Sequence, residues 1–454
     1  HLRIFDTDLS HFATTGYLGL EQDDRLKDAA AEAVYRFGTQ FPLSRTYVSH
    51  PLYTQLEKLL TEIYHYQSPV VAKNSTLAHI GTIPHAVGYD DVVILDHQVH
   101  WSVQNSCQQL KLKGIPVLMI RHSNMEELER YLISFKNRYE KVWYMADGIY
   151  SMYGDCLPVD RIKELMHKYK RLNLYVDDVH GMSWKGVHGS GFIKSHWEYI
   201  PERMVLVSTL SKSFGASGAI ILSGDVLLLR KIRNFGGPLT FSAQLEPMAV
   251  AAAIASAKIH LSPEITVLQQ RLRERINLFQ EILVDGGVPL MSTGDTPVFY
   301  IPTGMPDTAY VLMRKLGMAG FFVNPALFPA VPINNAGLRI TVSTHNSFQE
   351  ISYLGQVIGK QYGKVLASTG NSYDKVNRAF KRNFTAIKEP LVKKEELFFA
   401  SIYSSISEID EGLWNSLLGD HAFDHIGIKF LEKYFSSLAA EDPNHMEFTY
   451  HLVK

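Results

Sequence analysis

The chain has 454 residues, of which 46% are hydrophobic and 20% are charged, and its formal net charge is -1. This length exceeds what one hydrophobic core usually serves, so we expect two or more compact units. The balanced charge argues against a nucleic-acid-binding surface, and no apolar run is long enough to span a bilayer. The two cysteines, Cys107 and Cys156, lack the spacing of a metal site, so we expect no metal and a reduced, cytoplasmic setting.

Short apolar runs alternate with amphipathic segments between about residues 50 and 245. This alternation predicts an α/β domain with a mostly parallel sheet and helices on both faces. In such a sheet the ligand binds beyond the carboxyl ends of the strands. The predicted strands are residues 92–95, 117–120, 142–145, 174–176, 205–207 and 219–222, and the predicted helices are residues 125–135 and 159–169.

The remaining segments are predicted to form smaller parts. Helices at residues 246–260 and 265–285 lead into an α+β unit with strands at residues 298–301, 321–323 and 338–342. The chain begins at His1 rather than Met and ends in a strand-like run, which is the pattern of a fragment or a trimmed chain. The predicted division is an N-terminal arm with part of the small domain (1–50), a ligand-binding large domain (51–245), a small domain (246–366), a linker (367–374) and an appended segment (375–454).

The strongest local signal is a lysine that follows a buried-looking strand. Residues 205–218 read Val-Leu-Val-Ser-Thr-Leu-Ser-Lys-Ser-Phe-Gly-Ala-Ser-Gly and place Lys212 among hydroxyl residues and glycines. Partial burial lowers the pKa of a lysine and favours the neutral amine that forms an imine. Thr209 and Ser211 are suited to bind a phosphate, while the glycines let the backbone approach closely. Taken alone, the segment is about equally compatible with a solvated lysine in a loop.

The second signal is a pair of acids at the end of the preceding strand, Asp177 and Asp178, followed by His180. Buried acids need a cationic partner, and a protonated pyridine nitrogen is such a partner. A carboxylate opposite that nitrogen keeps the ring of pyridoxal 5'-phosphate an electron sink. The acids by themselves also suit a metal site or a helix N-cap. Because Asp177 and Lys212 end successive strands of one sheet, the two can converge on a single cofactor.

Several ordered motifs over residues 12–365 resemble the α-oxoamine synthases, fold-type-I pyridoxal-phosphate enzymes that include 8-amino-7-oxononanoate synthase and serine palmitoyltransferase. The motifs are Asp-Gly-Ile-Tyr-Ser-Met-Tyr-Gly-Asp at 147–155, Asp-Asp-Val-His-Gly at 177–181 and Thr-Leu-Ser-Lys-Ser-Phe-Gly at 209–215. The resemblance implies a large domain with a mostly parallel sheet and a smaller α+β domain. It also implies an acyltransferase that condenses an amino acid with an acyl-CoA or acyl carrier thioester, with decarboxylation, to give an α-amino ketone.

The same resemblance implies roles for individual residues. Lys212 would hold the cofactor as a Schiff base and remove the α-proton, while Asp177 and His180 would meet the ring nitrogen and the phenolic oxygen. His100 would stack on the ring, and Arg339 would bind the amino acid carboxylate in a bidentate fork. Without the resemblance, a lone histidine is more often structural, and an arginine in a strand more often lies at the surface. The other implied site residues are Thr209, Ser211, Ser75 and Thr76 at the phosphate, Thr240 or Ser242 at the neighbouring subunit's phosphate, and Ser151 at the substrate.

Three segments depart from the family pattern where family members face their substrates. Asn-Ser-Thr at 74–76 replaces a Ser/Thr-Gly-aromatic turn, residues 39–45 replace a glycine-rich stretch, and residues 14–16 lack an expected asparagine. These departures predict an unusual amino acid or acyl partner. Residues 322–332 are similar to serine palmitoyltransferase-like members, which favours a long-chain acyl thioester. In the appended segment, residues 402–415 resemble the start of an acyltransferase-like (GNAT-fold) domain.

Alternatives remain open at this point. An aminotransferase of the same fold often carries an arginine eight residues after the lysine, where this chain has Ile220. A lyase uses the same cofactor class, and a non-catalytic scaffold would have its main role in the tail. The resemblance also implies a homodimer with its site at the subunit interface. The sequence does not indicate which amino acid or acyl chain is used, or whether CoA or a carrier protein delivers the acyl group.

Overall fold

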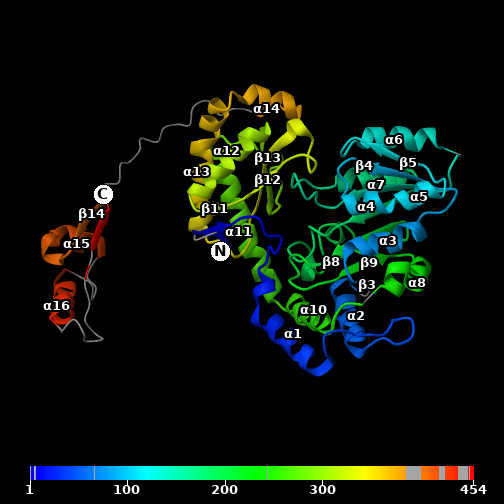
Figure 1. Cartoon of the computed structure of the whole chain (residues 1–454), viewed down its shortest axis with the longest axis horizontal. Coiled ribbons are helices and arrows are strands. Elements are labelled where there is room, and N and C mark those ends of the chain that lie inside the picture. Colours follow the sequence, from blue (N-terminus) through cyan, green and yellow to red (C-terminus); the bar gives the residue numbers. More distant parts are fainter. Residues whose placement is uncertain are drawn as a thin grey trace. The chain divides into compact units, whose positions relative to one another are not determined.

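The first of two units, residues 1–387, contains a seven-stranded sheet, and residues 388–454 form the second (Figure 1). The computed structural model describes residues 2–4, 7–65, 67–136, 138–242, 244–384, 400–418, 425–437, 448 and 450–453. In these residues no helix has both the length and the apolar character needed to cross a bilayer.

The large sheet has the strand order β3-β9-β8-β7-β6-β4-β5. Six of these strands run in the same direction and β9 runs in the opposite direction, so the predicted mostly parallel sheet is confirmed. All six strands predicted for this region are present, whereas the three-residue strand β3 was missed. The strands are β3 (Val70–Ala72), β4 (Val92–Asp96), β5 (Val117–Ile120), β6 (Val142–Asp147), β7 (Leu172–Asp177), β8 (Met204–Thr209) and β9 (Ala219–Ser223).

Helices cover both faces of this sheet (Figure 1), because alternate strand residues point to opposite sides. In β8, Val205 and Val207 enter one core while Met204 and Leu206 enter the other. Each such fully buried aliphatic side chain stabilises the fold by about 1.5–3 kcal/mol. One face packs against α3 (Ser75–Ala86), α4 (Trp101–Ser106), α5 (Gln108–Leu112) and α8 (Val226–Phe235); the other packs against α2 (Pro51–Ile63), α6 (Met125–Ser134), α7 (Val159–Lys168) and α10 (Pro247–His260).

A smaller antiparallel sheet with the order β10-β13-β12 follows in the chain. The N-terminal segment contributes to the same part of the unit, because β2 pairs with β11 and Tyr17 and Leu18 enter its core. The strands here are β1 (Leu2–Ile4), β2 (Thr7–His11), β10 (Val298–Gly304), β11 (Phe321–Phe322), β12 (Asn324–Ala326) and β13 (Ala336–Thr341). The other helices of the unit are α1 (Asp24–Phe37), α9 (Gly237–Phe241), whose Leu239 packs beside the large sheet, α11 (Glu264–Asp285), α12 (Pro306–Met318), α13 (Phe348–Ser368) and α14 (Tyr373–Phe380).

The boundary between the two units differs from the linker predicted at residues 367–374. That segment is instead the end of α13, a tight turn and the start of α14, and the first unit extends to Ile387. Asn371 in the turn is buried and donates to the Thr303 carbonyl at 2.7 Å, while Val376 and Phe380 of α14 lie in the small-domain core. The small polar residues therefore form a packed turn, and composition alone did not distinguish it from a linker.

The second unit contains a two-stranded antiparallel sheet and two helices among its described residues. Its buried core includes Ile406, Ile409 and Tyr450. The elements are β14 (Ala400–Tyr403), α15 (Glu411–Leu418), α16 (His425–Ser436) and β15 (Tyr450–Val453). The resemblance of this segment to an acyltransferase-like domain stays a prediction.

Candidate active site

The loops after β7 and β8 bring three of the predicted residues together. Asp177 ends β7, which pairs in parallel with β8, so the carboxyl ends of both strands lie at one edge of the sheet. His180 follows β7 and Lys212 follows β8. The Nζ atom of Lys212 lies 2.6 Å from Nε2 of His180. The amine, the imidazole and the carboxylate are therefore organised by two neighbouring strands.

Asp177 is 2% exposed, and its two oxygens have different partners. Oδ1 accepts the Val179 N–H at 3.1 Å, and Oδ2 accepts a hydrogen bond from Nε2 of His79 at 3.0 Å. Burial acts to raise the pKa of Asp177, but the hydrogen bond from His79 and the charges of nearby His100 and Lys212 outweigh it. The net effect is a pKa below its ordinary value, so this buried carboxyl stays ionised.

His79 is a site residue that the sequence analysis missed. It lies fully buried on α3, and its Nδ1 is 2.8 Å from the Tyr175 hydroxyl. Since a carboxylate only accepts, His79 carries a proton on Nε2, and Tyr175 can donate to Nδ1. A single histidine in an apolar helix gives no local signal of this role. Only the fold shows that α3 passes behind the end of β7.

Lys212 and His180 are both electrostatically prepared for proton transfer. Burial lowers the pKa of Lys212 to about 8, and the charge of Arg339 acts in the same direction. Burial, together with the charge of Lys212, holds the pKa of His180 well below its ordinary value. Near neutral pH His180 is therefore uncharged, and about a tenth of Lys212 is neutral amine, far more than for an exposed lysine.

Tyr17 connects this pair to Arg339. Its hydroxyl lies 2.8 Å from Nδ1 of His180, and burial raises the pKa of Tyr17 to about 12 although the adjacent Arg339 acts to lower it through its charge and a hydrogen bond. A guanidinium has only donors, so the Tyr17 proton goes to His180 Nδ1. His180 then carries its own proton on Nε2, the atom that faces Lys212.

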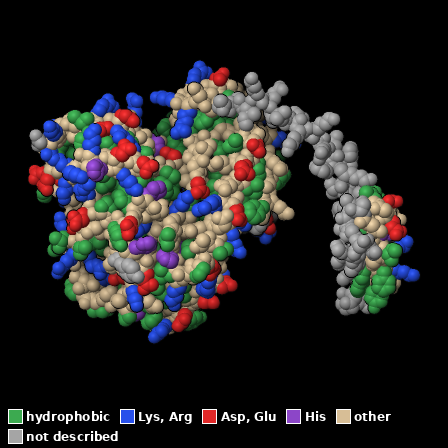
Figure 2. Space-filling model, turned by 180° about the vertical axis from the view of Figure 1, so that it is seen from behind, with side chains coloured by type: hydrophobic (Ala, Val, Ile, Leu, Met, Phe, Trp, Pro, Cys, Tyr) green, Lys and Arg blue, Asp and Glu red, His purple; other side chains and the backbone are tan. Residues whose placement is uncertain are grey.

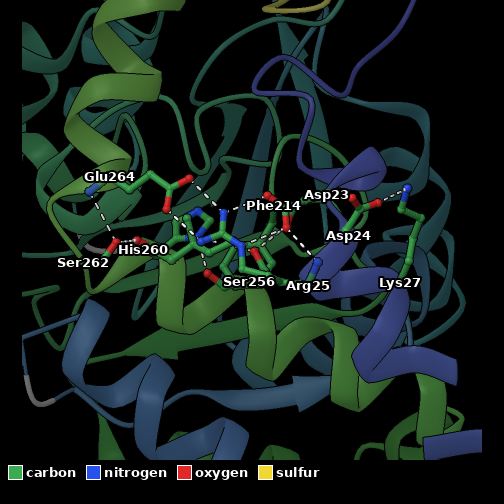
Figure 3. Close-up of polar contacts among 10 residues, drawn as sticks. Asp23, Asp24, Arg25, Lys27, Phe214, Ser256, His260, Ser262 and Glu264 are labelled. Carbon is green, nitrogen blue, oxygen red and sulfur yellow. Dashed lines mark hydrogen bonds and ion pairs between the residues drawn. The ribbon is translucent and has the colours of Figure 1, made fainter. Parts of the chain in front are cut away.

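The turn that holds Lys212 is tied down by hydroxyl groups. Thr209 and Ser211 donate to the Gly218 carbonyl at 3.0 and 3.1 Å. On the other side of the turn, Ser256 of α10 donates to the Phe214 carbonyl at 2.6 Å (Figure 3). Phe214 also stacks on the buried His260 ring at 4.3 Å. The backbone around Lys212 is thus fixed by contacts from both sides.

Figure 3 also shows the polar contacts that join α1 to α11 in this part of the unit. Arg25, in the first turn of α1, donates to Asp23 and to Glu264 at the start of α11. The two bonds measure 2.7 and 2.8 Å. Because Arg25 and Glu264 are largely exposed and Asp23 partly so, we expect the ion pairs to add little stability and mainly to set how the helix ends meet.

His100, Ser75 and Thr76 are further predicted site residues. His100 follows β4; its backbone N–H donates to Asp147 Oδ1 at 3.0 Å, and its Nδ1 contacts the Ser102 hydroxyl at 2.6 Å. Burial, and after it the charge of Asp177, raise the pKa of Asp147 well above its usual range. Ser75 and Thr76 form the first turn of α3, whose outward N–H groups suit an anion such as a phosphate.

The other predicted site residues have partners within the chain. Arg339 of β13 donates from Nε to the Ser151 carbonyl at 2.6 Å, which joins two segments far apart in the sequence. Thr240 is buried in α9, and its hydroxyl donates to the Gly236 carbonyl at 3.3 Å. The Ser242 hydroxyl donates to the Pro238 carbonyl. The structure of one chain therefore leaves the prediction of a contact to a neighbouring subunit untested.

These residues fit pyridoxal phosphate. A buried ionised carboxyl lies at the end of β7, an amine with a lowered pKa lies at the end of β8, and a helix N-terminus is available for a phosphate. Within the residues that the structure describes, no cluster of His, Cys, Asp and Glu has the arrangement of a metal site.

Comparison with known proteins agrees with this chemistry. The family model for aminotransferase class I and II matches residues 7–356. The 8-amino-7-oxononanoate synthase of Thermoanaerobacter pseudethanolicus is 30% identical over 344 residues, which cover 75% of this chain and 84% of that protein. The enzyme of that name from Symbiobacterium thermophilum is 31% identical over 345 residues, covering 75% and 85%.

Solved structures share the fold at lower identity. Serine palmitoyltransferase of Sphingomonas wittichii superimposes with a TM-score of 0.72 at 24% identity, covering 81% of this chain and 89% of that one. For 8-amino-7-oxononanoate synthase of Francisella tularensis the TM-score is 0.64 at 20% identity, covering 78% and 97%. The chain belongs to the aminotransferase class I and II family, and within it to the pyridoxal-phosphate-dependent α-oxoamine synthases.

Proposed function

We propose that this enzyme joins an amino acid to an acyl thioester, with loss of CO2, to give an α-amino ketone. The observation that carries the proposal is the chain of contacts from Lys212 through His180 and Tyr17 to Arg339. It connects an amine that can move a proton with a guanidinium that can hold a carboxylate. An α-amino acid carries its α-proton and its carboxylate on adjacent carbon atoms, so it suits this pair of groups.

The residues divide the work as follows. Bound pyridoxal phosphate supplies an electron sink for negative charge at the α-carbon. Asp177 would hold its negative charge toward the ring nitrogen, and His180 would offer its Nε2 proton to the phenolic oxygen. Lys212 accepts the α-proton at Nζ, for which its pKa of about 8 is well matched. Arg339 fixes the amino acid through its carboxylate, so that the α-carbon lies within reach of Lys212.

The acyl partner is proposed to carry a long chain. Residues 322–332 resemble the serine palmitoyltransferase-like members, and Phe328 and Ile333 in and beside this segment expose large apolar side chains next to β13. Exposed apolar groups near a binding site favour an apolar ligand. A series of acyl-CoA chain lengths, followed by thiol release, tests this; a preference for short or polar acyl groups contradicts it.

The homodimer is supported by the surface of the first unit. On the face shown in Figure 2, Lys and Arg side chains are interspersed with Asp and Glu. Large apolar side chains are nevertheless exposed at Tyr35, Tyr47, Phe235 and Phe241, in and near α1, α8 and α9. We propose that a second copy covers them and that Thr240 or Ser242 then approaches its cofactor. Sedimentation of the protein and of a Phe241→Glu variant tests this, since an active monomer would contradict it.

One experiment separates this function from its closest rival. Amino acids are screened for a shift in the absorbance of the bound cofactor, and the best one is then incubated with acyl-CoA. Release of free thiol and of CO2 in equal amounts supports the synthase. Formation of a keto acid without CO2 or free thiol would show an aminotransferase instead.

A further inference from the structure

A short loop connects the seven-stranded sheet of the first unit to the β10-β13-β12 sheet. Residues 149–156, called the bridging loop here, close on themselves through an Ile149–Cys156 bridge. Tyr150 N–H donates to the Asp155 carbonyl at 2.9 Å, and Gly154 N–H donates to the Tyr150 carbonyl at 3.0 Å. Because these bonds span the loop, a displacement of Asp155 is transmitted to Ser151 at its tip.

One end of the bridging loop is held by an ion cluster on the large sheet. His122, which follows β5, lies between two carboxylates: Nδ1 is 2.9 Å from Asp96 and Nε2 is 2.6 Å from Asp155. Asp96 ends β4 and is fully buried, and it also accepts the Tyr144 hydroxyl at 2.9 Å. Two acceptors on one imidazole require a proton on both ring nitrogens, so His122 acts as a cationic link between β4 and the loop.

The other side of the bridging loop rests on the small sheet. Thr296 donates to the Gly154 carbonyl at 2.8 Å. Gly154 has a φ of +71°, and a Cβ there would lie 2.1 Å from the Val298 carbonyl oxygen, so the loop backbone is in close contact with β10. Arg339 lies on the adjacent strand β13 and donates from Nε to the Ser151 carbonyl at 2.6 Å. This bond fixes the plane of the guanidinium, whose terminal nitrogens bond the Tyr17 hydroxyl and can also donate to a ligand.

We propose that His122 is a positioning residue for amino acid binding: by clamping Asp155 it fixes the Ser151 carbonyl and thereby the orientation of the Arg339 fork. The proposal rests on the proposed function, in which Arg339 holds the substrate carboxylate. A carboxylate is bound well only when both terminal nitrogens of the fork are aligned with its oxygens. A small rotation of the guanidinium therefore weakens amino acid binding without altering the cofactor residues on β7 and β8.

The groups around His122 also predict a pH dependence. Burial acts to lower the pKa of His122, but the hydrogen bonds and charges of Asp155 and Asp96 outweigh it and raise the pKa to about 9. The other groups that face this cluster are the Tyr144 hydroxyl from β6, bonded to Asp96, and the Tyr150 ring, edge-on to His122 at 4.4 Å. As the pH rises through about 9, His122 loses one proton and can donate to only one of the two carboxylates. The clamp then opens.

The test measures amino acid binding to the cofactor-loaded enzyme through the absorbance shift of the cofactor. His122→Gln and Asp155→Asn are each expected to raise the amino acid dissociation constant roughly 10- to 100-fold. The dissociation constant for pyridoxal phosphate is expected to stay unchanged in both. Because the two residues act through one contact, the amino acid dissociation constant of the double variant should be no higher than that of the weaker-binding single variant.

The matched control is His196→Asn, since His196 is also half-buried but its Nδ1 contacts the Phe192 carbonyl at 2.8 Å and the Ser195 hydroxyl at 3.3 Å, neither of which is a carboxylate. This variant should bind the amino acid as the unaltered enzyme does. In the unaltered enzyme, binding should weaken through about pH 9 more steeply than in Asp155→Asn. Equal pH profiles in the two proteins contradict the proposal, and this comparison stands even if His122→Gln does not fold.

An Arg339→Lys variant separates failure of this inference from failure of the proposed function. If Arg339→Lys leaves amino acid binding unchanged, the carboxylate role of Arg339 is wrong. If Arg339→Lys weakens binding but His122→Gln and Asp155→Asn do not, that role stands and the clamp is wrong. Weaker binding in all three variants, with intact cofactor affinity, supports both.

Discussion

The cofactor side of the active site and its substrate side differ in how their residues are placed. Asp177, His180 and Lys212 come from two neighbouring strands of one sheet, within 36 positions of one another in the printed sequence. Arg339 of β13 instead bonds Ser151, which lies 188 positions away in the loop that follows β6 of the large sheet. The first group is fixed by backbone pairing, whereas the second depends on side chains that join two parts of the unit.

This difference explains how one scaffold can keep its chemistry while its substrates vary. Parallel strands bring the carboxylate and the amine to one edge whatever the surrounding loops are. The Arg339 guanidinium, which we propose binds the substrate carboxylate, is instead positioned by contacts with the bridging loop and Tyr17. We therefore expect changes on the cofactor side to abolish chemistry and changes on the substrate side to alter binding.

The largest effect is expected from a change on the cofactor side, at Lys212. Lys212→Ala should prevent covalent attachment of the cofactor and lower turnover by roughly 10²- to 10⁴-fold through the loss of proton transfer. Borohydride reduction followed by intact-mass measurement should find the cofactor on the unaltered chain and not on the variant. Lys194→Met is the control, because Lys194 is also a buried lysine whose pKa burial lowers, but it donates to the Trp197 and Glu198 carbonyls. Covalently attached cofactor on the Lys212→Ala variant would show that another residue is the attachment point and would contradict the role given to Lys212.

A pH dependence of cofactor attachment should be nearly as large. Burial holds the pKa of Lys212 at about 8, and only the neutral amine attacks an aldehyde. The neutral fraction is about 1% at pH 6 and about half at pH 8, so the attachment rate to the cofactor-free protein should rise roughly 50-fold over that range and then level off. Stopped-flow absorbance with added pyridoxal phosphate measures it. A rate that keeps rising to pH 10 would mean that Lys212 has the pKa of an exposed lysine.

The same contrast explains which parts of the site could be predicted from the sequence. Asp177 and Lys212 stand at strand ends next to local patterns of acids, hydroxyls and glycines, and parallel strands share an edge, so their convergence followed from local signals. His79, Tyr17 and His122 reach the site from elements distant in sequence, and nothing next to them indicates a partner. Six strands of the large sheet were predicted correctly because they are continuous apolar runs. The turn before α14 was misjudged because small polar residues suit a linker and a buried turn equally well.

A smaller effect is expected from the residue behind Asp177. His79→Leu keeps the helix but removes the hydrogen bond to Asp177 Oδ2, so the pKa of this buried carboxyl should rise and its hold on the ring nitrogen weaken. A loss of one such charge-assisted bond is worth about 1.5–3 kcal/mol, or roughly 10- to 150-fold in cofactor affinity. Equilibrium dialysis of pyridoxal phosphate measures it. Thr82→Val, an equally buried change one turn further along α3, is the control and should leave the affinity unchanged.

The smallest expected effect tests whether the turn that holds Lys212 is fixed by its own hydrogen bonds or by the contact from α10. Ser256→Ala removes the hydrogen bond from α10 to the Phe214 carbonyl, two residues from Lys212, and leaves that buried carbonyl with one partner fewer. We expect the free energy of unfolding to fall by about 1–2 kcal/mol, measured by denaturant titration of the loaded enzyme. If the turn is held by Thr209 and Ser211 at Gly218, the pH profile of cofactor attachment should not move. A shift of that profile would mean that α10 sets the surroundings of Lys212, and the cofactor side would then depend on distant contacts as the substrate side does.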